Sequence, residues 1–217
     1  MSDGSNPLIL TDRTYALGIT ELSAHDSDLA TVISKWGNPP FWTHPPGFSG
    51  IVLAILSQQV SLESAQATFT KLEISIGSIQ PERFLALDAN EILAIGFSRQ
   101  KASYVRGVAE SMLAGELDWD EIESMDNEQA RQRLISLRGI GPWTADTYLL
   151  FALRRADAWP SADLALEKAI HELRGLSTIL STEEIDSIAQ SWRPWRAVAA
   201  RILWHHYLNE RGRGTLV

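Results

Sequence analysis

The amino-acid sequence predicts an all-α fold, and three observations lead to this prediction. Apolar residues recur mostly at helical spacing, and almost no stretch alternates between apolar and polar residues as a half-buried strand does. Helix signals accompany this spacing, because Asp126 followed by Gln129 forms a capping-box pattern and Gly96 stands where a helix C-cap belongs. With 217 residues and 45% hydrophobic residues, the chain can bury a substantial core, as one large domain or two small ones.

The apolar spacing places helices along nearly the whole chain. The prolines at 39–40 and 45–46 predict a stiff loop between two of them. Residues 1–20 show weak periodicity and are expected to form a partly ordered arm. The expected helices cover about residues 26–36, 48–56, 61–75, 81–86, 88–94, 98–114, 118–123, 126–137, 142–153, 163–174, 181–190 and 194–210.

Composition excludes several classes of protein. The sequence has no run of 18 apolar residues and no basic-then-apolar leader, so we expect no membrane association. It predicts a soluble protein that is cytoplasmic (nucleoid-associated) or nuclear and not secreted. There is no cysteine, which excludes disulfides and thiolate-ligated metal centres.

The net charge of −8 is unusual for a nucleic-acid-binding protein, but it is unevenly distributed. Residues 116–128 contain seven acidic residues and no Lys or Arg, which leaves the remainder of the chain near neutrality. Basic residues cluster at 99–106, at 131–138 and in the tail from 191. Such clusters are either solvated faces or a nucleic-acid-binding surface, and the charge pattern leaves both interpretations open.

Residues 137–145 read Leu-Arg-Gly-Ile-Gly-Pro-Trp-Thr-Ala and predict a helix–tight turn–helix. Gly139 and Gly141 flank Ile140, so the turn can take positive φ and bring its backbone close to a partner. Pro142 suits the first position of the following helix. Because helix-start N–H groups have no intrahelical partner, such a turn is suited to binding a phosphate.

Asp163 follows Trp143 by 20 residues, in the segment Pro-Ser-Ala-Asp-Leu at 160–164. An acid before an apolar run is an ordinary helix N-cap. A carboxylate at a fixed offset from a phosphate anchor also suggests chemistry on a nucleic acid. The two roles are compatible in one side chain.

Three segments together resemble the helix-hairpin-helix (HhH-GPD) DNA glycosylase superfamily. The similarity is to its AlkA-type branch, 3-methyladenine DNA glycosylase II. Residues 137–145 with 160–164 resemble the family's hairpin and catalytic-aspartate pattern. Residues 55–61, Ile-Leu-Ser-Gln-Gln-Val-Ser, resemble its Gly-Gln-Gln-Val-Ser helix start, with Ser57 in place of Gly. Residues 192–199 resemble its Trp-x-Pro-Trp-Arg segment.

The resemblance implies one module of two helical lobes with the active-site cleft between them. Lobe one would comprise about residues 20–60 and 165–217, and lobe two about 60–160 with the hairpin at 126–153. At 217 residues the chain has no room for the additional N-terminal α/β domain of AlkA. The absence of cysteine excludes the iron–sulfur cluster of the endonuclease III and adenine-mismatch branches.

The resemblance also assigns roles to residues. Asp163 would be catalytic, stabilising the oxocarbenium-like transition state of base excision. Trp143 occupies the slot where bifunctional members carry a Schiff-base lysine, which implies a monofunctional enzyme without lyase activity. Ala162 stands where the family often carries a further acid. The expected base-pocket residues are Trp143, Trp195, Trp192, Phe41 and Trp42.

The DNA would be held by the hairpin and by a wedge that fills the space left by the flipped base. Gln59 matches the family's wedge position. The expected DNA-binding residues are Gln58, Gln59, Ser61, Gly139, Ile140, Gly141 and Thr144. Backbone carbonyls of Ile135, Leu137 and Ile140 would hold a monovalent cation, Na⁺ or K⁺, and no other cofactor is expected. His205 and His206 are interpreted as surface or partly packed residues rather than a metal pair.

The sequence thus predicts a monomeric glycosylase that excises alkylated purines, 3-methyladenine and 7-methylguanine, from damaged double-stranded DNA. Two alternatives remain open at this point. One is a related glycosylase for ethenoadenine, hypoxanthine or uracil. The other is a non-catalytic helix-hairpin-helix DNA-binding module.

Overall fold

The computed structural model describes residues 7–178 and 180–214, and in these ranges the regular structure is helical, with thirteen α-helices and one isolated β-bridge between Ile9 and Arg155. The all-α prediction is confirmed. The chain divides into two compact units. We call residues 44–148 the central unit, and residues 7–43 with those described from 149 onward the terminal unit. These units differ from the expected lobes in two places. Residues 44–60 belong to the unit of the hairpin and not to lobe one, and residues 149–160 belong to the terminal unit and not to lobe two.

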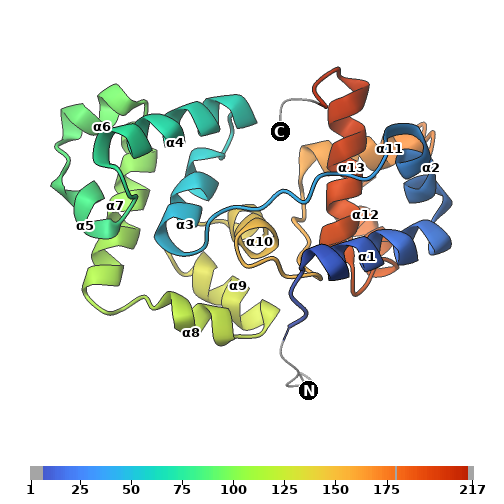
Figure 1. Ribbon diagram of the computed structural model, residues 1–217, viewed down its shortest axis with the longest axis horizontal. Helices are drawn as coiled ribbons and strands as arrows, with labels where there is room; N and C mark the ends of the chain where they lie inside the picture. Colours follow the sequence, from blue (N-terminus) through green and yellow to red (C-terminus); the bar gives the residue numbers. More distant parts are fainter. Residues whose placement is uncertain (1–6, 179, 215–217) are drawn as a thin grey trace. The chain divides into compact units, whose positions relative to one another are not determined.

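The central unit is built around a buried helix, α3 (Gly47–Leu56), whose residues from Gly50 to Leu56 are all buried. A helix that is apolar on every side must be covered on every side. Helices α4 and α7 pack against α3, and α5 packs against α7 (Figure 1). The other helices of this unit are α4 (Leu62–Ile76), α5 (Pro81–Ala86), α6 (Ala89–Ile95), α7 (Arg99–Leu113), α8 (Trp119–Ser124), α9 (Asn127–Ile135) and most of α10 (Pro142–Phe151).

The terminal unit has α13 (Arg196–Glu210) at its centre, with every residue from Ala197 to Leu203 buried. Helices α1, α2 and α11 pack against it (Figure 1). This unit comprises α1 (Asp12–His25), α2 (Ser27–Trp36), α11 (Leu164–Leu173), α12 (Thr182–Gln190), α13 and the last residues of α10. Among the described residues, no helix is both long enough and apolar enough to cross a membrane.

The expected arm at residues 1–20 is wrong for the part of it that the structure describes. Thr11 and Thr14 form a capping box that begins α1 at Asp12. The helix buries a narrow stripe that includes Tyr15 and Ile19, and a Cβ on Gly18 would lie 2.9 Å from the Trp195 ring. The stripe is too narrow to give strong periodicity. Residues 1–6 lie outside the described residues.

The two helix signals read from the sequence are confirmed. Asp126 and Gln129 form a capping box at the start of α9, and Gly96 ends α6 in the left-handed region at a φ of 119°. The other expected helices begin and end within a few residues of their predicted bounds. Local capping chemistry therefore sets most of the boundaries.

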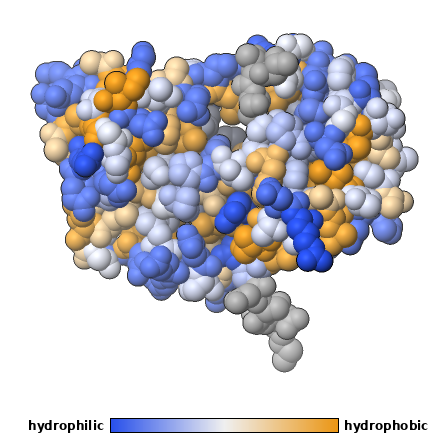
Figure 2. Space-filling view, viewed as in Figure 1, coloured by the Kyte–Doolittle hydropathy of each residue, from blue (hydrophilic) through white to orange (hydrophobic). Residues whose placement is uncertain are grey.

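The acidic run is mostly exposed, whereas several residues of the basic clusters have partners within the protein. The acids of residues 116–128 are mostly exposed, and the surface over α8 in Figure 2 is largely hydrophilic. Arg131 pairs with the buried Asp146 at 2.7 Å, and Arg133 donates to the carbonyl oxygen of Glu116. Lys101 donates to the carbonyl oxygen of Leu56 at 2.6 Å. The solvated-face interpretation therefore accounts for the acidic run.

His205 and His206 are buried, with exposed fractions of 7% and 6%. Of the two positions expected for them, surface or partly packed, the surface position is wrong. Helix α13 is covered along this stretch by α2 and α11. The His206 ring lies 3.6 Å from Glu172 and 3.8 Å from Glu210, and neither ring nitrogen makes a hydrogen bond. Burial lowers the pKa of His206 below its usual value, against the opposing effect of these two carboxylates.

We expect His206 to make the protein less stable in mild acid. Because folding lowers its pKa, the unfolded chain takes up the proton more readily as the pH falls below the usual histidine value. The charged groups that face His206 are Glu172, Glu210, Lys35 and Arg211. The pKa of each glutamate is lowered and that of Arg211 is raised, so these three keep their charge between pH 7.5 and 5.5. Denaturant unfolding at these two pH values should show a loss of stability in the wild type that is smaller in His206→Gln. Equal losses in both proteins would contradict this assignment.

Candidate active site

The hairpin turn lies between the end of α9 and the start of α10. Gly139 has a φ of 88°, in the left-handed region, and the N–H of Ile140 donates to the carbonyl oxygen of Leu137 at 3.1 Å. Gly141 does not have positive φ, so the predicted conformational role holds for Gly139 alone. The N–H of Ile140 is used inside the turn, which corrects its expected part in phosphate binding.

Two side chains fasten this turn from within the central unit. The ring of Tyr104 lies so close to Gly139 that a Cβ there would meet it at 2.1 Å. The Nε2 of Gln58 donates to the Gly139 carbonyl oxygen at 2.9 Å and to the Thr144 hydroxyl at 3.0 Å. Thr144 is 3% exposed, so its hydroxyl serves the interior and not the DNA surface. Gln58 likewise holds the turn in shape.

The outer side of the turn is open. Apart from its two chain neighbours, no described residue has an atom within 4 Å of a Cβ placed on Gly141, so neither packing nor φ requires glycine there. In the described part of the chain, the N–H groups of Gly139 and Gly141 have no hydrogen-bond acceptor. The adjacent Arg138 is exposed. An anion with close access to this backbone is the partner that such a turn fits.

Gln59 protrudes from the loop between α3 and α4 in a strained conformation. Its φ is 56°, which is uncommon for a residue with a side chain, and it is exposed. Val60 and Leu62 beside it are 45% and 55% exposed. Ser61 is exposed and caps α4 by accepting from the Ser64 N–H at 3.3 Å. Strain of this kind concentrates at functional positions.

Asp163, in the terminal unit, has its carboxylate held by three donors on one oxygen. Oδ1 accepts from the N–H groups of Ala165 and Leu166, both at 3.0 Å, and from the Trp204 indole at 3.1 Å. The residue is the N-cap of α11 and is 9% exposed. Burial, and then the negative charge of Asp163, raises the pKa of Glu167 one turn later. Both roles predicted for Asp163 are therefore geometrically compatible.

An aromatic cluster adjoins Asp163 in the same unit. The Phe151 and Trp204 rings stack with centroids 5.2 Å apart, and Trp204 is the residue that donates to Asp163. Arg201, which is fully buried, has its guanidinium 5.3 Å from the Phe151 ring and 5.4 Å from the Phe41 ring. Sequence reasoning missed Phe151 and Trp204, because each lies inside a helix where an aromatic residue is indistinguishable from core.

Arg201 fixes the segment that carries the two predicted aromatic residues Phe41 and Trp42. Its guanidinium donates to the carbonyl oxygens of Trp42 and Leu150, both at 2.9 Å. Phe41 stacks on Tyr15 with ring centroids 4.6 Å apart. Burial lowers the pKa of Arg201 to about 10, which leaves it cationic at neutral pH. Phe41 and Trp42 are thus held near the aromatic cluster through Arg201.

Trp192 and Trp195, predicted to line the base pocket, are buried in the terminal unit with exposed fractions of 3% and 6%. Their indole N–H groups donate to Asp26 at 2.8 Å and to Glu21 at 2.6 Å. These contacts join the motif at 192–199 to α1 and the start of α2. Packing alone accounts for both side chains.

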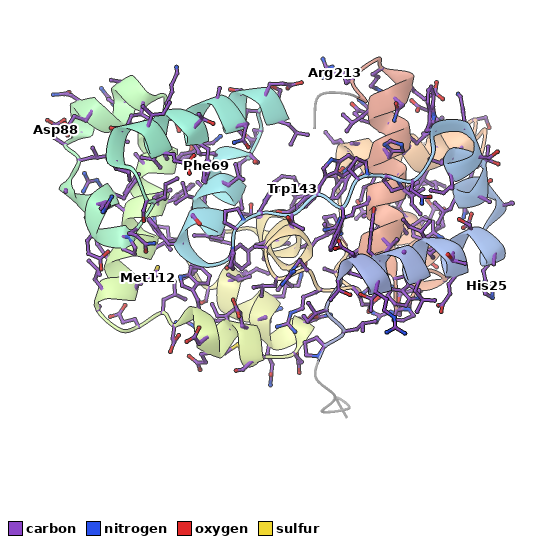
Figure 3. The ribbon with its side chains drawn as sticks, in the orientation of Figure 1. His25, Phe69, Asp88, Met112, Trp143 and Arg213 are labelled. Atoms are coloured by element: carbon purple, nitrogen blue, oxygen red, sulfur yellow. The ribbon has the colours of Figure 1, made fainter. Side chains whose placement is uncertain are left out.

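Trp143 belongs to the central unit, in the first turn of α10, and is half-buried (Figure 3). No lysine occupies this position, as the sequence had indicated. Among the described residues, no group of three or more His, Cys, Asp or Glu side chains could hold a metal ion. The carbonyl of Ile135 lies at the end of α9, where helix carbonyls lack intrahelical partners. Leu137 lies two residues beyond α9, and its carbonyl oxygen accepts from the Ile140 N–H.

The described residues combine a helical fold with a glycine hairpin whose N–H groups are open and a fixed carboxylate at a helix start, which are features of a DNA-processing helix-hairpin-helix protein. The chain belongs to the HhH-GPD superfamily of base excision DNA repair proteins, whose family model matches residues 52–194.

Relatives support the same assignment. The chain is 28% identical to the alkylbase DNA glycosidase-like protein mag2 of Schizosaccharomyces pombe, over 89% of this chain and 94% of that protein. It is 30% identical to a DNA-3-methyladenine glycosylase of Bacillus subtilis, over 74% of this chain but 57% of that protein. Its structure is similar to that of the S. pombe 3-methyladenine DNA glycosylase Mag1 in complex with abasic DNA, with a TM-score of 0.79 and 27% identity over 87% of this chain and 95% of that one.

Proposed function

We propose that this protein is a monofunctional DNA glycosylase that flips alkylated purines out of duplex DNA and hydrolyses their N-glycosidic bond. The observation that carries the proposal is the Asp163 carboxylate, fixed by three donors beside the Phe151–Trp204 pair. The names of the relatives, which include 3-methyladenine glycosylases, point to the same class of substrate.

Hydrolysis of the N-glycosidic bond of these bases requires one negative charge near the sugar. In 3-methyladenine and 7-methylguanine nucleotides the base is already cationic, so it leaves C1′ with the bonding electron pair and becomes neutral. Positive charge develops on the sugar, and the Asp163 carboxylate stabilises it. Water then adds its oxygen to C1′ and releases a proton, which completes the hydrolysis. No strong general acid is required.

Aromatic faces next to this carboxylate suit a cationic base. A tryptophan face attracts a cation by ~0.5–2 kcal/mol. Phe151 and Trp204 are the aromatic residues connected to Asp163 within the terminal unit. We assign no base contact to Trp192 and Trp195, because packing explains them. Trp143 cannot form a Schiff base, so the abasic product should remain uncleaved.

The central unit would hold the DNA. The open N–H groups of Gly139 and Gly141 would bind one backbone phosphate. A Na⁺ or K⁺ ion at the carbonyls of Ile135, Leu137 and Ile140 would add positive charge to this grip, and carbonyl oxygens at a helix end are ligands that fit such an ion. Gln59, exposed and strained, would fill the space that the flipped nucleotide leaves.

The direct test is to incubate the protein with methylated duplex DNA and to identify the released bases by chromatography. We expect release of 3-methyladenine and 7-methylguanine and intact abasic strands on a denaturing gel. Binding without base release would contradict the alkylated-purine proposal, and substrates with ethenoadenine, hypoxanthine or uracil would then be tested. Inactivity on all of them would favour a DNA-binding module.

A further inference from the structure

The turn that presents Asp163 is anchored by one carboxylate on a neighbouring helix. Asp186 of α12 accepts from the Trp159 indole at 2.9 Å and from the Ser161 hydroxyl, which lies 2.9 Å from each of its two oxygens. Two of the four residues before Asp163 are therefore fixed by the same side chain.

The residue between this anchor and Asp163 is strained. Ala162 has a φ of 59°, in the left-handed region, although it is neither glycine nor asparagine. The Ser161 N–H closes the turn by donating to the Trp159 carbonyl oxygen at 3.0 Å. A residue stays in such a conformation only where its surroundings impose it.

The anchor itself is rigid. Trp159 is 6% exposed, and its ring centroid lies 5.5 Å from that of Trp192. Trp192 is in turn hydrogen-bonded to Asp26. Asp186 therefore connects the Ser161 hydroxyl to a packed part of the terminal unit.

We propose that Asp186 is a positioning residue for Asp163. By holding Trp159 and Ser161 it keeps Ala162 in the left-handed region, and this directs the Asp163 carboxylate toward its three donors. The proposal rests on the proposed function, since it assigns a catalytic consequence to the placement of Asp163.

The physical reason is that the position of Asp163 tolerates little change. Its Oδ1 meets two backbone N–H groups and one indole at once, and a return of Ala162 to negative φ would turn the chain at the residue before it. A misplacement of about 1 Å at a reacting group can reduce a rate about 100-fold. We expect the ground-state affinity for DNA to be independent of this placement.

The experiment compares Asp186→Asn with Glu183→Gln, which removes the same charge from an exposed position on the same helix. Asparagine keeps one acceptor oxygen but turns an N–H₂ group toward the second donor. We expect the single-turnover rate of base release to fall about 10- to 100-fold in Asp186→Asn, with the Kd for DNA unchanged. Glu183→Gln should match the wild type in both quantities.

A second pair of variants separates positioning from stability. Ser161→Ala removes the hydroxyl that Asp186 binds, whereas Ser161→Thr keeps it. The single-turnover rate should fall in Ser161→Ala and stay near the wild-type value in Ser161→Thr. The proposal would be overturned if Asp186→Asn released the base as fast as the Glu183→Gln control. It would also be overturned if the unfolded fraction at the assay temperature explained the loss of rate.

A crystal structure of Asp186→Asn tests the proposal independently of activity. We expect Ala162 at negative φ and a broken hydrogen bond between Trp204 and Asp163. An unchanged turn would overturn the positioning role. A wild-type protein inactive on every substrate would instead contradict the proposed function, while the geometry of the variant would still decide whether Asp186 places Asp163.

Discussion

Asp163→Asn is expected to lose base release by about 100- to 1,000-fold while remaining folded. The amide oxygen of asparagine can still accept from the Ala165 and Leu166 N–H groups and the Trp204 indole, and asparagine is as good an N-cap as aspartate. The variant therefore removes the charge while keeping the shape. Since the developing positive charge on the sugar is what the carboxylate stabilises, the loss should fall on the chemical step.

The measurement is the single-turnover rate of 3-methyladenine release, together with the Kd for the same duplex. Asp163→Ala is the comparison, because it should lose the rate to a similar extent and also ~0.5–2 kcal/mol of stability with the cap. Base release by Asp163→Asn at the wild-type rate would remove Asp163 from the catalytic role.

Gly139→Ala and Gly141→Ala are expected to differ sharply, although the two glycines are two residues apart. At Gly139 a methyl group would lie 2.1 Å from the Tyr104 ring, on a backbone with a φ of 88°. Left-handed strain and overpacking together should destabilise this variant by about 2–5 kcal/mol. At Gly141 a methyl group meets no described residue beyond its chain neighbours and needs no unusual φ, so stability should change by less than about 0.5 kcal/mol.

DNA affinity, unlike stability, should be affected by the substitution at Gly141. The methyl group of Gly141→Ala would stand where a phosphate approaches the turn, and we expect the affinity for abasic duplex DNA to fall about tenfold, or ~1.4 kcal/mol. Denaturant unfolding and fluorescence anisotropy at fixed salt measure the two effects. Normal DNA affinity in Gly141→Ala would mean that the open side of the turn does not face the phosphate backbone.

The sequence was sufficient for the helices because their boundaries depend on local chemistry. Asp126 with Gln129 and Gly96 each fix a helix end through neighbouring residues alone. α1 was missed, because its stripe of buried residues is narrow and Gly18 is buried by a residue far away in the chain, Trp195. Contacts at long sequence separation leave no local pattern.

The lack of a local pattern for long-range contacts also explains which residues of the candidate site could be predicted from the sequence. Asp163, Gly139 and Gly141 can be singled out from the sequence because they lie in motifs with a fixed spacing. Trp204 cannot, because its importance lies in a hydrogen bond across 41 residues to Asp163. Thr144 was assigned to the surface, although its hydroxyl accepts from Gln58, 86 residues away in the sequence.

The hydrogen bonds of the Gln58 amide bear on how the protein would search DNA for a damaged base. The amide connects the loop that carries Gln59 directly to the hairpin, so the proposed wedge residue and the proposed phosphate-binding turn would keep a fixed distance from each other within the central unit. With this distance fixed, Gln59 would meet one nucleotide at a set interval from each phosphate that the hairpin binds. The protein would then examine DNA one phosphate at a time. An undamaged base stack would resist the entry of Gln59 without weakening the hold of the hairpin on the phosphate.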